Sequence, residues 1–154
     1  MDAIADRSSF RCTLRVRYHE TDQQGIVYHA RYFEYLDVAM TEYFRHIGWP
    51  YTELVTGGCD PSLVKTTVEF LGSARFDECI CISVTPARVG SNSYTLAFRV
   101  VREMNQQLLL SAETVYVNLD PTTQKSRPLP PDFRAKLQAD LAEDITGDSS
   151  QRAL

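Results

Sequence analysis

The chain has 154 residues, of which 44% are hydrophobic and 23% charged, and its formal net charge is −4. These values suit one soluble globular domain with a single core, and the negative balance argues against a basic surface that attracts nucleic acid. No apolar run approaches the roughly 20 residues that a membrane-spanning helix needs. Residues 1–9 are polar and lack an apolar signal core, so we expect a flexible N-terminus and a cytoplasmic protein.

Hydrophobic periodicity predicts a strand and then a long helix in the first third of the chain. Apolar and polar residues alternate over residues 10–18, which indicates a half-buried strand. From about Ala30 the apolar period changes to three and four, which predicts an amphipathic helix of about four or five turns. Gly48 follows the last apolar residue of that helix and is expected to cap it, and Pro50 prevents its continuation.

Four strand-like segments follow with no helix between them: 63–71, 79–89, 94–102 and 108–118. Such strands must pair mainly antiparallel, and Pro86 suggests a bulge or an edge position within the second of them. Residues 132–142 have a helical pattern, and 144–154 are expected to form a flexible tail. One long helix covers only one face of an antiparallel sheet, so a second subunit is the simplest cover for the remaining face or edge.

The segment 20–29, Glu-Thr-Asp-Gln-Gln-Gly-Ile-Val-Tyr-His, joins the first strand to the long helix. It can place the Asp22 carboxylate near the unpaired N–H groups of a helix start. A carboxylate that attacks or activates water, beside N–H groups that hold a developing oxyanion, is suited to acyl transfer. Asp is also common in turns and helix caps, so the same residue is compatible with a structural role. Gly25 indicates a backbone conformation that other residues avoid.

The stretch 16–33 closely resembles the signature of the 4-hydroxybenzoyl-CoA thioesterase family. It is most similar to the branch that includes the small acyl-CoA thioesterases associated with the Tol-Pal system. The shared pattern is an aromatic strand end, an acidic-x-Asp group, a glycine three residues after the Asp, and Val-Tyr-His leading into the helix. The resemblance covers roughly 10–119. It implies the α+β hotdog fold, a curled antiparallel sheet of five or six strands wrapped around one long helix, as a single domain over 10–143.

The resemblance also implies an activity and a site. The expected reaction is hydrolysis of an acyl-CoA thioester to a free acid and CoA, without a cofactor, by a homodimer or homotetramer whose active sites lie at subunit boundaries. Asp22 matches the catalytic carboxylate, which acts as nucleophile or general base. His29 matches the residue whose backbone N–H polarises the thioester carbonyl, and in the Tol-Pal branch its side chain is also implicated. The expected substrate-binding residues are Tyr18, Gly25, Val27, Tyr28, Lys65 and Arg88.

The sequence departs from the family pattern at two places. The branch that hydrolyses 4-hydroxybenzoyl-CoA carries an aromatic residue where this chain has His29, which argues against that particular substrate. Where some members place basic residues for the CoA phosphates, this chain has Ser-Asn-Ser at 91–93, so Lys65 and Arg88 are the candidates to replace them. An acyl-carrier-protein thioesterase is therefore an alternative. A non-catalytic hotdog dimer that binds acyl thioesters is another, although the intact acidic-x-Asp pattern argues against it.

Other reactive side chains give weaker signals. The four cysteines have no second Cys or His pair at a zinc-site spacing, so we expect reduced, partly buried thiols and no bound metal. Glu34 lies on the long helix, and another hotdog branch uses a helix Glu as its base. In this chain we interpret Glu34 as part of the solvent-facing side of the helix.

Overall fold

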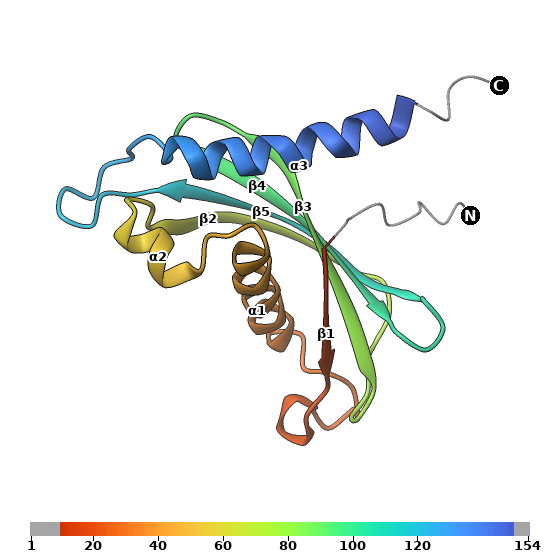
Figure 1. The fold of residues 1–154 in the computed structure, drawn as a ribbon. Helices are drawn as coiled ribbons and strands as arrows, with labels where there is room; N and C mark the ends of the chain where they lie inside the picture. The colour runs from red at the N-terminus through yellow and green to blue at the C-terminus, as the bar shows by residue number, and fades with distance from the viewer. Residues whose placement is uncertain (1–9, 150–154) are drawn as a thin grey trace.

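The computed structural model describes residues 10–149, and side chains over 10–141 (Figure 1). Its elements are β1 (Arg11–Arg15), the 3₁₀ turn η1 (Tyr18–Glu20), α1 (Arg31–His46), α2 (Tyr51–Thr56), β2 (Pro61–Phe70), β3 (Cys79–Val89), β4 (Ser93–Arg102), β5 (Leu108–Asn118) and α3 (Pro131–Ser149). The five strands form one sheet in the order β1-β3-β4-β5-β2, and every neighbouring pair is antiparallel. The sheet curls around α1, which confirms the predicted α+β hotdog fold.

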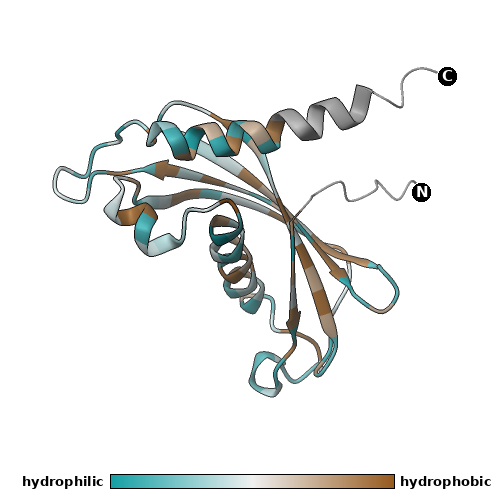
Figure 2. Ribbon diagram, in the orientation of Figure 1, coloured by the Kyte–Doolittle hydropathy of each residue, from teal (hydrophilic) through white to brown (hydrophobic). Residues whose placement is uncertain are grey.

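The core lies between α1 and the concave face of the sheet. Hydrophobic residues follow the strands, whereas hydrophilic residues gather in the loops (Figure 2). The α1 residues that face the sheet are buried and recur at intervals of three and four, as an amphipathic helix requires. These residues are Tyr32, Tyr35, Leu36, Ala39, Met40, Tyr43 and Phe44. Gly48 follows the helix with φ +85°, a left-handed conformation that ends it as the sequence predicts.

The first strand is shorter than predicted. It ends at Arg15, and Tyr18 lies in η1 with 80% of its surface exposed, although alternation placed it on the buried face. Val16 still pairs with the chain before β3, since its N–H donates to the Glu78 carbonyl at 2.9 Å. The backbone N–H of the next residue, Arg17, donates instead to the carboxylate of Glu20 at 2.7 Å. This side-chain acceptor replaces the strand ladder and turns the chain.

Pro86 lies at an irregularity in β3, as predicted. The register with β4 shifts between Pro86 and Arg88. The partner on the other side, β1, pairs only with Cys79–Ser83, so Pro86 lies beyond it. The missing N–H of proline therefore removes no bond from the β1–β3 ladder.

The helix predicted over 132–142 extends from Pro131 to Ser149. It runs alongside β3 and packs its first turn into the core, where Phe133 is fully buried against Phe44 and Tyr94. The Tyr43 hydroxyl donates to Asp140 further along the helix. The sequence predicts flexible ends at 1–9 and 144–154. Residues 144–149 are instead the last turns of α3, whereas 1–9 and 150–154 lie outside the described residues.

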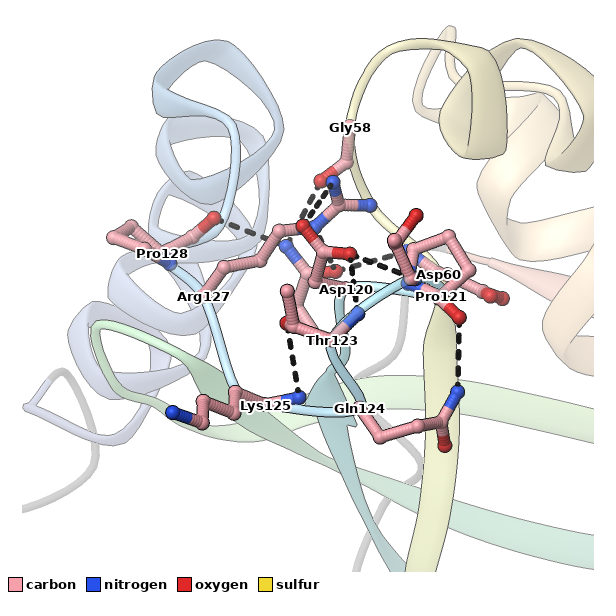
Figure 3. A network of polar contacts seen from close by, with 11 residues as sticks. Gly58, Asp60, Asp120, Pro121, Thr123, Gln124, Lys125, Arg127 and Pro128 are labelled. Carbon is pink, nitrogen blue, oxygen red and sulfur yellow. Dashed lines mark hydrogen bonds and ion pairs between the residues drawn. The ribbon is translucent and has the colours of Figure 1, made fainter.

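A buried amide at the end of β5 joins two other segments, whose residues Gly58, Asp60, Arg127 and Pro128 are labelled in Figure 3. Asn118 is fully buried, and its Nδ2 donates to the carbonyls of Gly58 and Pro128 at 2.9 and 3.0 Å. Its Oδ1 accepts from the Asp60 N–H at 2.9 Å and from Arg127 Nε at 3.3 Å. We call these contacts the Asn118 network. It connects the start of β2 and the segment before α3 to the centre of the fold.

Over residues 10–149, the strand β2 leaves one edge of the sheet unpaired. Within that range it is hydrogen-bonded only to β5, and it exposes the apolar side chains of Leu63, Val64 and Phe70 by 55%, 57% and 52%. Among the described residues, no helix is long and apolar enough to cross a membrane.

Candidate functional site

The predicted site is built on a narrow hairpin between η1 and α1. A bridge pairs Thr21 with Val27, and the Asp22 N–H donates to the Ile26 carbonyl at 2.9 Å. The turn closes when the Gly25 N–H donates to the Asp22 carbonyl at 3.0 Å. Gly25 has φ +74°, which explains why a glycine stands there. Asp22 therefore lies at the first position of a tight turn whose geometry is fixed by its own backbone.

The Asp22 carboxylate is only half engaged by this turn. Its Oδ1 accepts the N–H of Gln24 at 2.8 Å, a local bond typical of Asp in turns. Within the described part of the chain, its second oxygen accepts no hydrogen bond, and the side chain is only partly buried. The turn role and a chemical role are thus compatible, because the bond that holds the carboxylate leaves one oxygen open.

The helix start supplies a free N–H next to the hairpin. The first three residues of α1 already donate: Arg31 to Tyr28, Tyr32 to His29 and Phe33 to Ala30, at 2.8, 3.3 and 3.3 Å. Ala30 is the N-cap and provides no side-chain cap. The backbone N–H of His29 donates to none of the described residues. An unpaired N–H at a helix start is a ready hydrogen-bond donor to a negatively charged oxygen.

Asp22 and His29 line the same cavity, which has a volume of about 200 Å³. Its other lining residues are Gln24, Ile26, Val27, Tyr32, Phe70, Gly72 and Ser73. Three of the predicted site residues, Asp22, Val27 and His29, thus lie at one cavity. Tyr32 and Phe70 form an aromatic wall, with ring centroids 5.9 Å apart at a steep angle. Sequence periodicity assigned neither residue to the site, because their meeting depends on how the sheet curls.

Three predicted substrate-binding residues, Tyr18, Gly25 and Tyr28, do not line this cavity. Tyr18 is 80% exposed and packs edge-on against Phe76, with centroids 5.7 Å apart. Tyr28 is 44% exposed and packs on the ring of His29. Gly25 lies at the turn, with the guanidinium of Arg75 close by. Contact of these three residues with substrate stays a prediction.

The two predicted phosphate-binding cations lie outside the cavity of a single chain. Lys65 is exposed on the edge strand β2, and Arg88 is exposed near the far end of β3. At a rise of about 3.3 Å per residue, Arg88 lies up to roughly 30 Å along the strand from Cys79. Neither lines the cavity with Asp22. Glu34, on α1, is exposed and forms an ion pair with Arg31 at 2.8 Å, as expected for the solvent side of a helix.

The carboxylate of Glu20 is buried at the base of the hairpin. Glu20 is 1% exposed, and its Oε2 accepts from the Arg17 N–H and the Tyr35 hydroxyl, both at 2.7 Å. Its Oε1 accepts from Arg17 Nε and Nη2 at 2.9 and 2.7 Å. We call these contacts the Glu20 network. Burial alone raises the pKa of Glu20, but the bonds from Arg17 and Tyr35 outweigh burial and lower it below its ordinary value.

The fold and this cavity together define a hotdog-fold protein with a site at the start of its long helix. The chain belongs to the thioesterase-like superfamily, since the model of that family matches residues 16–137. The acyl-CoA thioester hydrolase YbgC of Escherichia coli is 33% identical over 129 residues, which cover 84% of this chain and 96% of that protein. The acyl-CoA thioesterase YbgC of Haemophilus influenzae is 32% identical over 111 residues, covering 71% and 79%. The family predicted from 16–33 is confirmed.

Solved structures support the same fold. A DHNA-CoA thioesterase from Staphylococcus aureus superimposes with a TM-score of 0.83 at 20% identity, over 89% of this chain and 93% of that chain. A 1,4-dihydroxy-2-naphthoyl-CoA thioesterase from Synechocystis gives 0.78 at 19% identity, over 86% and 97%. At this level of identity the likeness establishes the hotdog fold and does not extend to the substrate.

Proposed function

We propose that this protein is an acyl-CoA thioesterase that hydrolyses a thioester to a free acid and CoA. Membership of the thioesterase-like superfamily and identity above 30% to proteins named as acyl-CoA thioester hydrolases support this function. The observation that carries it is local: the open carboxylate oxygen of Asp22 and the residue with the free helix-start N–H, His29, line one cavity. A thioester is an activated acyl group, so these two groups are sufficient equipment for its hydrolysis.

The proposed chemistry uses Asp22 in one of two ways. As a general base, it takes a proton from water while the water oxygen bonds to the thioester carbon. The carbon–sulfur bond then breaks, and the proton passes to the departing CoA thiolate. As a nucleophile, the carboxylate itself bonds to that carbon and expels the thiolate, and water then hydrolyses the resulting anhydride. Both routes give one acid and one thiol for each water consumed.

The proposed role of His29 is to stabilise the carbonyl oxygen as it becomes negative. Its backbone N–H is unpaired within the described residues and belongs to the positive end of α1. Removal of one such donor costs roughly 10²–10³ in turnover in a well-studied hydrolase. The His29 side chain packs at a tilt against Tyr28, and His29 lines the cavity, so its ring is a proposed contact for the acyl group or the sulfur.

Replacement of Asp22 tests the proposal directly. Asp22→Asn keeps the side-chain oxygen that accepts the Gln24 N–H, so the variant is expected to fold. It loses the base or nucleophile, and turnover is expected to fall by at least ~10²-fold. Thiol release from acetyl-, butyryl- and benzoyl-CoA measures this loss, with Glu34→Gln as a control carboxylate on the exposed side of α1. Near-wild-type turnover in Asp22→Asn would show that the assignment is wrong.

We also propose that the active form is a homodimer or homotetramer in the cytoplasm. The unpaired edge of β2 and its exposed Leu63 and Val64 favour a second copy as partner. Four free thiols are typical of a reducing compartment. A charge on the edge, in Val64→Lys, is expected to reduce the molecular mass in sedimentation to that of one chain. An unchanged mass would exclude the β2 edge as the contact.

An acyl carrier protein is a second candidate carrier of the acyl group. The observation that favours it is the cavity lining, which holds neither Lys nor Arg among the described residues of one chain to receive the CoA phosphates. If Lys65 and Arg88 supply those contacts from a second copy, charge-removing variants of both will raise KM for acyl-CoA. Faster turnover of carrier-protein thioesters than of CoA thioesters would favour the alternative.

A further inference from the structure

A buried carboxylate ends the turn that precedes the Asp22 hairpin, and its neighbours point to a catalytic purpose. We propose that Glu20 is a positioning residue, which holds the hairpin carrying Asp22 at a fixed place against α1 through Arg17 and Tyr35. This inference rests on the proposed role of Asp22. It adds a second carboxylate to the site, one that acts through another residue and does not touch the substrate.

The contacts of Glu20 reach all the segments that must be held together. Arg17 lies between β1 and η1 and gives Glu20 its backbone N–H and its guanidinium. Tyr35, in the second turn of α1, gives its hydroxyl. These donors occupy both carboxylate oxygens, and the side chain is 1% exposed. One residue therefore links the end of the first strand to the helix whose start borders the cavity.

The backbone of Glu20 anchors the hairpin at its base. Its carbonyl accepts the Tyr28 N–H at 2.9 Å, and the next pair along is the Thr21–Val27 bridge. Asp22 lies on one side of that bridge and His29 follows on the other. A shift of Glu20 therefore moves the carboxylate relative to the helix start. A displacement of about 1 Å in an active site costs on the order of 10²-fold in rate.

Stability alone does not explain a charge at this place. Taking a carboxylate out of water is costly, and well-packed apolar groups of similar size often stabilise a fold equally well or better. A charged acceptor holds its donors in more closely defined positions, because charge-assisted hydrogen bonds are shorter and stronger than neutral ones. Tyr35 depends on it in turn: its buried hydroxyl has Glu20 as acceptor, and burial together with that bond raises the pKa of Tyr35.

The test is a double-mutant cycle that joins Glu20 to Asp22. Glu20→Gln preserves the shape and removes the charge, and kcat is expected to fall by ~10–100-fold while KM changes less than ~3-fold. In the Asp22→Asn background the same change is expected to alter residual turnover by less than ~2-fold, because there is no base left to position. Turnover is measured by thiol release at saturating butyryl-CoA, normalised to folded protein by circular dichroism. Glu34→Gln is the matched control and is expected to leave kcat unchanged.

Each result shows whether Glu20 positions the Asp22 hairpin or only stabilises the fold. Equal kcat losses from Glu20→Gln in both backgrounds, or a wild-type kcat in the single variant, would overturn the proposal for Glu20. If Glu20→Gln does not fold, Tyr35→Phe keeps the carboxylate and removes only its contact to α1. A ~3–10-fold loss of kcat that vanishes in the Asp22→Asn background then supports positioning, and an additive loss contradicts it. Wild-type turnover in Asp22→Asn itself would remove the proposed function instead.

Discussion

Two buried polar side chains in different parts of the fold have all their polar atoms hydrogen-bonded. Asn118 and Glu20 are each buried to 1% exposure or less, and each satisfies both polar atoms of its end group with four hydrogen bonds or ion-pair contacts. Asn118 is neutral and lies in a junction of loops far along the chain from the cavity. Glu20 is charged and lies at the base of the hairpin that carries Asp22. The comparison suggests that a neutral amide is sufficient to join loops. A charged carboxylate is used where the position of the hairpin that carries Asp22 must be fixed.

The largest expected effect on stability comes from the Asn118 network. Asn118→Ala removes four contacts and leaves buried backbone groups unpaired, so the free energy of unfolding is expected to fall by about 3 kcal/mol. The kcat per folded molecule should be unchanged. Urea unfolding and thiol release measure the two quantities. Asn92→Ala, which loses one exposed bond to Ser126, is the control and should cost about 0.5 kcal/mol. A selective loss of kcat in Asn118→Ala would break the comparison.

Two glycines with positive φ allow the effect of backbone strain on kcat to be told apart from its effect on stability. Gly25 and Gly48 have φ of +74° and +85°; a methyl group at Gly48 meets no atom within 4 Å, and one at Gly25 meets only Arg75 Nη1, at an ordinary contact distance of 3.7 Å. Alanine at each position is expected to cost about 1 kcal/mol through backbone strain alone. Only Gly25→Ala should also lower kcat, by roughly tenfold, because relaxation of its φ moves the Asp22 turn. Equal kcat values in the two variants would show that the turn geometry does not control turnover.

The smallest expected effect is a pH dependence that distinguishes the charged network from the neutral one. The pKa of Glu20 is lowered in the folded state, so its stabilisation is complete above the pKa of the unfolded chain, about 4.3. It is lost as pH falls through the folded-state pKa. The stability difference between wild type and Glu20→Gln should therefore be constant from pH 6 to 8 and shrink below about pH 4. The Asn118→Ala difference should not change, and a parallel decrease in both would contradict this assignment.

Sequence periodicity predicted most of the elements because their cause is local. Strand-like runs between turn signals gave the bounds of β3 and β5, and the period-three-and-four pattern gave α1. The alternation over 10–18 failed at the end of β1, where the Glu20 carboxylate accepts the Arg17 N–H, since a side chain competing for backbone donors leaves no periodic signal. Asp22 and His29 came from a motif. Their wall of Tyr32 and Phe70 did not, because residues so far apart in the chain meet only when the sheet curls.

The order of strands also has a kinetic consequence. The β3, β4 and β5 strands are consecutive, so short loops join them, whereas β1 must find β3 across the pair Arg11–Ser83 and β2 must find β5 across Pro61–Asn118. Closing long loops slows folding, so the central meander is expected to assemble before the flanking strands. The cavity needs the segments next to β1 and β2 together with the first turn of α1. It is therefore expected to be the last part of the molecule to form, so a newly made chain has most of its sheet before it has a complete cavity.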